Sequence, residues 1–124
     1  MKQNLVAWFE IPVSDMDRAK QFYDKVFDIN IQIQDFGGVL MGWFPGQGDI
    51  PGASGSLVKQ ETYIPSQEGT LVYFHCEDLA NELGRVADAG GVVTQEKTKI
   101  SDEIGYMGVA TDTEGNRIAF YTQP

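Results

Sequence analysis

The stretch VAWFEIPVSDMDRAKQFYDKVF, residues 6–27, changes from a strand pattern to a helix pattern within a few residues. Residues 4–11 alternate between two faces that both look covered, which predicts a strand. After Pro12, either Ser14 or Asp15 can cap a helix. The apolar residues that follow recur at three- and four-residue spacing, namely Met16, Ala19, Phe22, Tyr23, Val26 and Phe27. The segment therefore predicts a strand followed closely by an amphipathic helix.

Short strand patterns separated by turn residues follow this helix. We expect strands over 30–36, 39–44 and 54–60. Gly37-Gly38 marks a turn between the first two, and a loop rich in Gly and Pro precedes the third.

The second half of the chain repeats this order after a polar connector, residues 61–68. Asp78 can cap a second helix that stops at Gly90-Gly91, and shifting the second half by 63 residues places Asp78 on Asp15. We expect further strands over 70–77, 92–97, 105–112 and 116–122. The turn before the last strand has the chemistry of a hairpin at Asp112, Gly115 and Asn116. The pattern predicts one domain, 1–124, made of βαβββ repeats over 1–60 and 69–124.

Composition and charge narrow the possible partners. The chain has 124 residues and a mass of 13.7 kDa, which suits a single soluble domain. Its net charge of -9 disfavours nucleic acid and anionic membranes, and no apolar run is long enough to span a bilayer. Cys76 is the single cysteine and no signal peptide pattern is present, so we expect a cytoplasmic protein in which Cys76 is structural.

The order of elements, the passage Pro12-Val13-Ser14-Asp15 and the turn Asp112, Gly115, Asn116 resemble the vicinal oxygen chelate superfamily of glyoxalase, bleomycin-resistance and extradiol-dioxygenase proteins. The resemblance implies an α+β fold of two βαβββ modules, each sheet curved into a cup with its helix outside. It also implies a homodimer, since many relatives of this length pair around their cups. Because this scaffold carries many chemistries, the resemblance indicates the fold more strongly than the activity.

Enzymes of this superfamily hold a divalent metal with four side chains, usually His and Glu. The resemblance places these positions at Trp8, near Ser56, at Leu71 and at Ala119. Trp, Leu and Ala offer no metal-binding atom, and one serine cannot hold a transition metal. We therefore expect no metal and no cofactor.

Two side chains near these positions could supply acid/base chemistry or a displaced pair of metal ligands. Glu10 shares the face of Trp8, and His75 shares the face of Leu71, because residues two apart on a strand point the same way. His75 is the only histidine, and a hydrogen-bonded structural role is the simpler reading for it. Glu10 could instead make a buried hydrogen bond or lie exposed.

Aromatic residues are the other candidates, because aromatic rings with polar tips suit a flat or cationic organic ligand. If the alternation holds, the residues that line the cups are Trp8, Trp43, Tyr73, Tyr106 and Tyr121. The alternative is that they fill the cups as ordinary core.

Three functions follow from these residues. The first is a metal-independent protein of the bleomycin-resistance type that binds a small organic ligand, aromatic or cationic, in the cup. The second is a glyoxalase-like lyase, isomerase or dioxygenase that uses Glu10 and His75. The third is a dimeric interaction or regulatory module.

Overall fold

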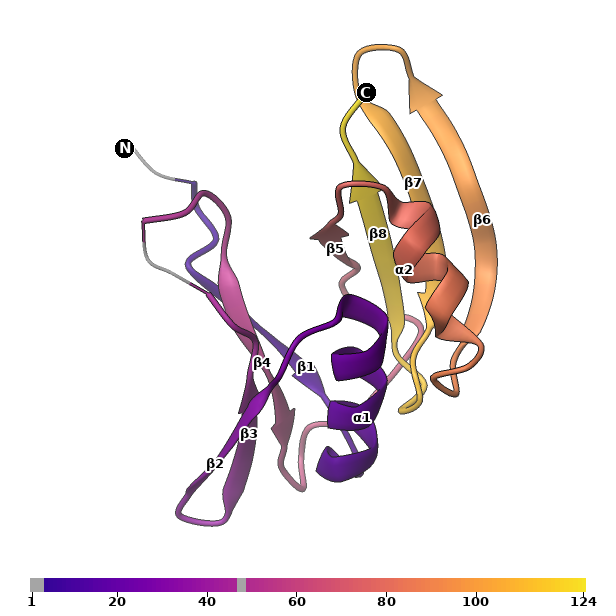
Figure 1. The fold of residues 1–124 in the computed structure, drawn as a ribbon. Coiled ribbons are helices and arrows are strands. Elements are labelled where there is room, and N and C mark those ends of the chain that lie inside the picture. The colour runs from indigo at the N-terminus through magenta and orange to yellow at the C-terminus, as the bar shows by residue number, and fades with distance from the viewer. Residues whose placement is uncertain (1–3, 47–48) are drawn as a thin grey trace.

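The computed structural model describes residues 4–46 and 49–124, and in these residues the chain forms two four-stranded mixed sheets and two helices (Figure 1). The first half supplies β1 (Trp8–Pro12), α1 (Met16–Phe27), β2 (Gln32–Phe36), β3 (Val39–Trp43) and β4 (Ser54–Lys59). Its strands lie in the order β1-β4-β3-β2, with β1 and β4 parallel and the other pairs antiparallel.

The second half has the same order of elements. It supplies β5 (Val72–His75), α2 (Leu79–Val86), β6 (Val92–Ser101), β7 (Gly105–Thr111) and β8 (Arg117–Thr122). Its sheet has the order β5-β8-β7-β6, again with one parallel pair, β5 and β8. The predicted α+β fold of two βαβββ modules is confirmed.

The registers of the two sheets correspond. Glu10 pairs with Ser56 and Tyr73 pairs with Ala119, so both parallel pairs join residues 46 apart. Each sheet also has a glycine directly beneath its helix. A Cβ at Gly42 would lie 3.1 Å from the sulfur of Met16, and one at Gly108 would lie 2.6 Å from Cδ1 of Leu83. Close contact between helix and sheet therefore requires glycine at the same place in both halves.

The helix α1 begins and ends where local sequence predicts. The Asp15 side chain accepts a hydrogen bond from the backbone N–H of Arg18 at 3.0 Å, which satisfies a donor of the first turn. At the other end, Asp28 adopts a left-handed conformation with φ 53°. The apolar face buries Phe22, Tyr23 and Val26 completely.

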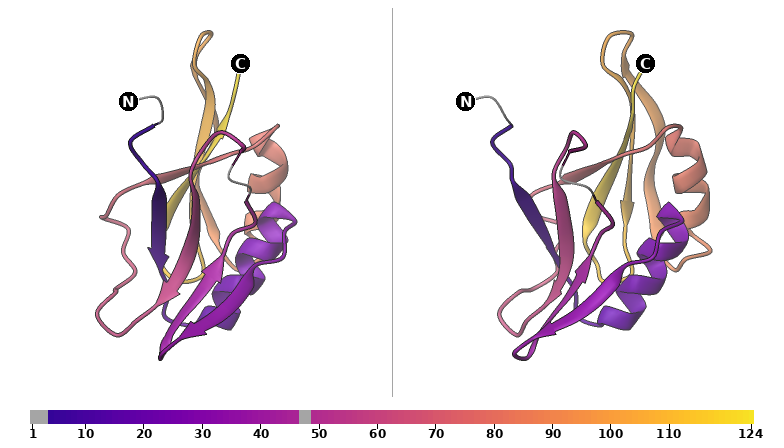
Figure 2. Two further views of the ribbon diagram at one scale, coloured as in Figure 1. Left: turned by 90° about the vertical axis from the view of Figure 1, so that its left-hand side faces the viewer. Right: turned by 60° about the vertical axis from the view of Figure 1, so that its left-hand side comes forward.

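One core lies between the helix-facing sides of the two sheets. Phe22 and Phe120 are fully buried in it, together with Leu57 from the first sheet and Leu79 from α2. The two helices lie beside each other on the same side of the molecule (Figure 2). Both sheets turn one face to the helices, which leaves the opposite face of each sheet open.

The turn before β8 also joins the two halves, beyond its predicted role as a hairpin. Asp112 is buried and accepts a hydrogen bond from the hydroxyl of Tyr23 at 2.5 Å, and Asn116 donates to the carbonyl of Pro12 at 2.7 Å. Gly115 has a φ of 92°, which favours glycine in this turn. These contacts attach the last hairpin to the first helix.

Two predicted boundaries were wrong. The first strand begins at Trp8 instead of residue 4, because its partner β4 begins only at Ser54, opposite Trp8. The strand predicted over 92–97 continues to Ser101, because it pairs with β7 as far as Gly105. Its outer half is polar and exposed, so it carries no apolar alternation that sequence reasoning could detect.

Candidate functional site

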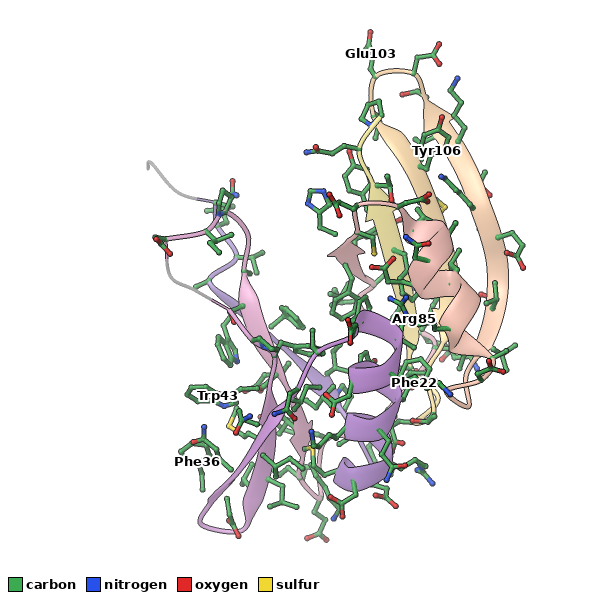
Figure 3. All side chains as sticks on the ribbon, viewed as in Figure 1. Phe22, Phe36, Trp43, Arg85, Glu103 and Tyr106 are labelled. Atoms are coloured by element: carbon green, nitrogen blue, oxygen red, sulfur yellow. The ribbon has the colours of Figure 1, made fainter. Side chains whose placement is uncertain are left out.

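The open side of the first sheet carries an aromatic platform, which we call the N-terminal face. Alternation along β1, β2, β3 and β4 places six side chains on it: Trp8, Glu10, Phe36, Met41, Trp43 and Ser56. Figure 3 shows Phe36 and Trp43 on the side of the sheet turned away from α1. The ring centroids of Trp8 and Trp43 lie 5.7 Å apart in a T-shaped arrangement, and those of Phe36 and Trp43 lie 6.3 Å apart, nearly stacked.

These rings are open to solvent and do not form core. Trp8 is 39% exposed, Trp43 is 40% exposed and Phe36 is 50% exposed. The reading of Trp8 and Trp43 as ordinary core residues is therefore wrong. Three large apolar rings that remain exposed and in contact form the kind of surface that soluble proteins use for binding.

Polar groups lie within this platform. Ser56 pairs with Glu10 on one side and with Trp43 on the other. It is fully buried, and its hydroxyl has no hydrogen-bond partner among the described residues. A buried hydroxyl without a partner is unfavourable, and a bound ligand could supply the missing hydrogen bond. Glu10 is exposed, so its reading as a buried structural group is wrong.

The open side of the second sheet forms a separate surface, the C-terminal face. Alternation places Tyr73, His75, Met107, Ala119 and Tyr121 on it. His75 and Tyr121 have ring centroids 5.6 Å apart, and the hydroxyl of Tyr121 donates to the carbonyl of Ile104. Tyr73 is 50% exposed and His75 is also exposed, so the reading of His75 as a buried core residue is wrong.

Tyr106 does not share the C-terminal face, which corrects its predicted place. Its neighbour Met107 pairs with Tyr121, so Tyr106 points to the opposite, helix-facing side of the sheet. There it packs against the core, and the ammonium of Lys97 lies 4.8 Å from the centre of its ring (Figure 3). Tyr106 therefore has a structural environment on the covered side.

Glu10 and His75 do not line a common cleft in the part of the chain that the structure describes. Glu10 lines a cleft of about 410 Å³ beside the connector residue Ile64 and Asn116. His75 borders a different cleft of about 430 Å³ that contains Phe74 and Glu82. Within one copy of the chain the structure therefore does not bring these two residues together as an acid and base.

The donor set does not fit the divalent metal that the superfamily's enzymes hold. Of the four corresponding positions, Trp8, Ser56 and Ala119 lie on the two open faces, and Leu71 directly precedes β5. Ser56 alone among them offers an oxygen. No cluster of three or more His, Cys, Asp or Glu side chains within residues 4–46 and 49–124 could hold a metal ion.

Sequence reasoning missed several residues of these surfaces. Phe36 and Met41 share the face of Trp43 through the β2–β3 hairpin, and alternation about Gly37-Gly38 could have revealed them. Glu82 lies beside the apolar stripe of α2 and lines the cleft of His75. An acidic residue next to such a stripe is a weak signal in sequence alone.

Comparison with known proteins agrees with this architecture. Residues 5–120 match the model of the Glyoxalase/Bleomycin resistance protein/Dioxygenase superfamily. The chain belongs to this superfamily. A glyoxylase-like domain-containing protein of Didymella fabae is 30% identical over 122 residues, which cover 96% of this chain and 94% of that protein.

Solved structures of the superfamily share the fold at lower identity. An antibiotic-binding protein from Streptomyces sp. CB03234 superposes with a TM-score of 0.72 at 23% identity, covering 100% of this chain and 99% of that one. A glyoxalase/bleomycin resistance protein from Albidiferax ferrireducens gives 0.73 at 15% identity, covering 97% and 100%. Glyoxalase I from Zea mays gives 0.70 at 16% identity, with 94% of this chain matching 43% of the maize chain. At these identities the likeness concerns the fold alone.

No helix in the described residues has the length and apolar character needed to cross a membrane.

Proposed function

We propose that this member of the glyoxalase/bleomycin-resistance superfamily binds a small organic ligand on its N-terminal face, without a metal and without converting the ligand. The observation that carries the proposal is the exposed platform of Trp8, Trp43 and Phe36 around the buried, unpartnered hydroxyl of Ser56. An antibiotic-binding protein with the same fold supports ligand binding as a use of this scaffold.

The chemistry of the face favours a flat aromatic cation. The rings of Trp8 and Trp43 offer π-faces that attract cations, and Glu10 adds a carboxylate to the same surface. The net charge of -9 favours approach of a cation and disfavours nucleic acid. Ser56 would supply one hydrogen bond to fix orientation.

We further propose that the protein is a cytoplasmic homodimer. Each sheet leaves one face open, and both faces expose large side chains, Trp43 on the first and Tyr73 on the second. A second copy that places its C-terminal face over the N-terminal face would enclose the ligand between Trp43 and Tyr73, and a two-fold arrangement would form this site twice. Such a dimer would also bring Glu10 of one copy and His75 of the other to the same cavity.

The test is calorimetric titration with N-methylquinolinium, a flat aromatic cation, compared with naphthalene-2-sulfonate, an anion of similar size. We expect binding of the cation, weakened about tenfold or more in Trp43→Ala because one stacking surface is lost. Tyr63→Ala is the matched control, since Tyr63 is 43% exposed but lies in the connector. Equal binding of cation and anion, or an equal loss in both variants, would contradict the proposal.

A second readout separates binding from catalysis. The ligand is recovered after incubation with protein and analysed by mass spectrometry. We expect its mass to be unchanged. Conversion of a hemithioacetal or a catechol that is lost in Glu10→Gln would overturn the binding function and favour the enzyme.

A further inference from the structure

A cleft of about 430 Å³ opens between the two modules, on the helix-facing side of the sheets. Phenylalanines from separate elements form its apolar wall: Phe9 of β1, Phe27 at the end of α1, Phe44 after β3 and Phe74 of β5. The ring centroids of Phe27 and Phe74 lie 4.7 Å apart, and those of Phe44 and Phe74 lie 5.5 Å apart. All four rings are only partly buried, although each packs against the core. The cleft therefore presents continuous aromatic surface, and its volume is in the range of small-molecule sites.

One acidic side chain in the lining lacks a partner. The Oε1 atom of Glu82, on α2, is buried and has no hydrogen-bond partner among the described residues. A carboxylate in such surroundings is unfavourable unless a cation or donor approaches it.

The remaining charges at the cleft point the same way. None of the described lining residues is Lys or Arg, and His75 at the border is the one basic side chain among them. Phe27 and Ile29 flank the C-terminal end of α1, where the helix dipole favours positive charge. The cleft thus combines an aromatic wall, an unpartnered acidic oxygen and a negative helix end.

We propose that this inter-module cleft binds a primary organic ammonium ion, with its apolar body against the four phenylalanines and its N–H groups donating to Oε1 of Glu82. This site is separate from the N-terminal face, because its wall comes from side chains on the opposite side of the first sheet. It would give the protein a second ligand site, independent of the proposed function.

The test uses 2-phenylethylamine and its neutral analogue 2-phenylethanol, which have nearly the same shape. Binding is measured by calorimetry and by chemical shift changes in the ¹H–¹⁵N spectrum. We expect the amine to bind about tenfold more tightly than the alcohol, since a hydrogen bond to a charged group contributes roughly 1.5–3 kcal/mol. The largest shifts should fall at the amides of Gly55, Phe74 and Glu82, with little change at the two indole N–H signals.

Two variants locate the interaction. Glu82→Gln should reduce amine affinity to that of the alcohol, whereas Glu68→Gln, which changes the net charge equally at an exposed connector residue, should not. Trp43→Ala should leave amine binding unchanged, so failure of the N-terminal face and failure of this cleft can be distinguished.

Other outcomes would overturn the proposal. Equal affinity for amine and alcohol in the unaltered protein is one, and it does not depend on whether Glu82→Gln folds. Shifts confined to the indole signals would assign the amine to the N-terminal face. Absence of binding in the dimer, together with binding in the monomer, would assign the cleft to a second copy of the chain.

Discussion

Arg18 and Glu114 form a two-point ion pair between the first helix and the last hairpin, with Nε–Oε2 and Nη2–Oε1 distances of 2.7 and 3.0 Å. The Glu114 carboxylate also accepts the backbone N–H groups of Ser14 and Asp15, at 2.9 and 2.8 Å. Its side chain is fully covered, whereas that of Arg18 is 51% exposed. Glu114 therefore binds the start of α1 in addition to pairing with Arg18.

Glu114→Ala should lower the free energy of unfolding by about 1–2 kcal/mol, the usual cost of losing a capping interaction. Arg18→Ala should cost less, because exposed ion pairs contribute little and the backbone hydrogen bonds to Glu114 remain. Urea unfolding followed by circular dichroism measures both. An equal loss in the two variants would mean that the ion pair, and not the capping of α1, carries the stability.

The stabilising effect of Glu114 should depend on pH. Burial raises the pKa of this carboxyl, but hydrogen bonds from Arg18, Asp15 and Ser14 outweigh it, so its pKa lies below the usual 4.5. A pKa lowered in the folded state adds stability above 4.5, which is lost as the pH falls through the folded value. The destabilisation caused by Glu114→Gln should thus be larger at pH 7 than at pH 3. A difference that grows toward pH 3 would contradict this assignment.

Two glycine substitutions should have opposite effects. Gly108→Ala places a Cβ 2.6 Å from Leu83 and 3.1 Å from the carbonyl of Gln95, so it should destabilise the second module by about 1–3 kcal/mol through overpacking. Gly84 is an exposed residue within α2, and a Cβ added there would meet no atom within 4 Å. Gly84→Ala should therefore stabilise by about 0.5–1 kcal/mol. Thermal unfolding of both variants tests the pair.

The Cys76 thiol should be unreactive in the folded protein. Burial, with Glu82 as the next cause, raises the pKa of Cys76 to about 12. At pH 8 the thiolate is therefore scarce, and Ellman's reagent should label the native protein far more slowly than the urea-unfolded chain. Rapid native labelling would show that Cys76 is more accessible than the structure describes.

The proposed dimer should shield both tryptophans. Acrylamide should quench Trp8 and Trp43 efficiently in dilute protein, since each is about two-fifths exposed, at 39% and 40%. As sedimentation shows the dimer to form with rising concentration, the quenching constant should fall. Dimerisation with unchanged quenching would place the interface elsewhere and leave the N-terminal face open.

Local patterns explain how much of the fold could be predicted. The limits of α1 depend on the Asp15 cap and on apolar residues three and four apart, and both signals lie within the helix itself. The order of βαβββ elements followed from similar signals. The start of β1 did not, because it depends on where β4 begins, more than forty residues later, opposite Trp8 at Ser54.

The candidate site was less accessible to sequence reasoning. Alternation correctly placed Trp8 and Trp43 on one face, because β1, β3 and β4 run without interruption. Tyr106 was misplaced because its face follows from the pairing of Met107 with Tyr121, a register set by tertiary structure. The position of Glu82 depends on how the two modules dock, which no local pattern encodes.

Neither sheet takes a strand from the other half of the chain, and the two parallel pairs keep the same register. What corresponds in the two halves is the framework, whereas the paired side chains differ: Glu10 with Ser56 in one and Tyr73 with Ala119 in the other. A duplicated framework of this kind separates heritable architecture from recognition chemistry. Selection can alter either face while the companion module preserves its own specificity.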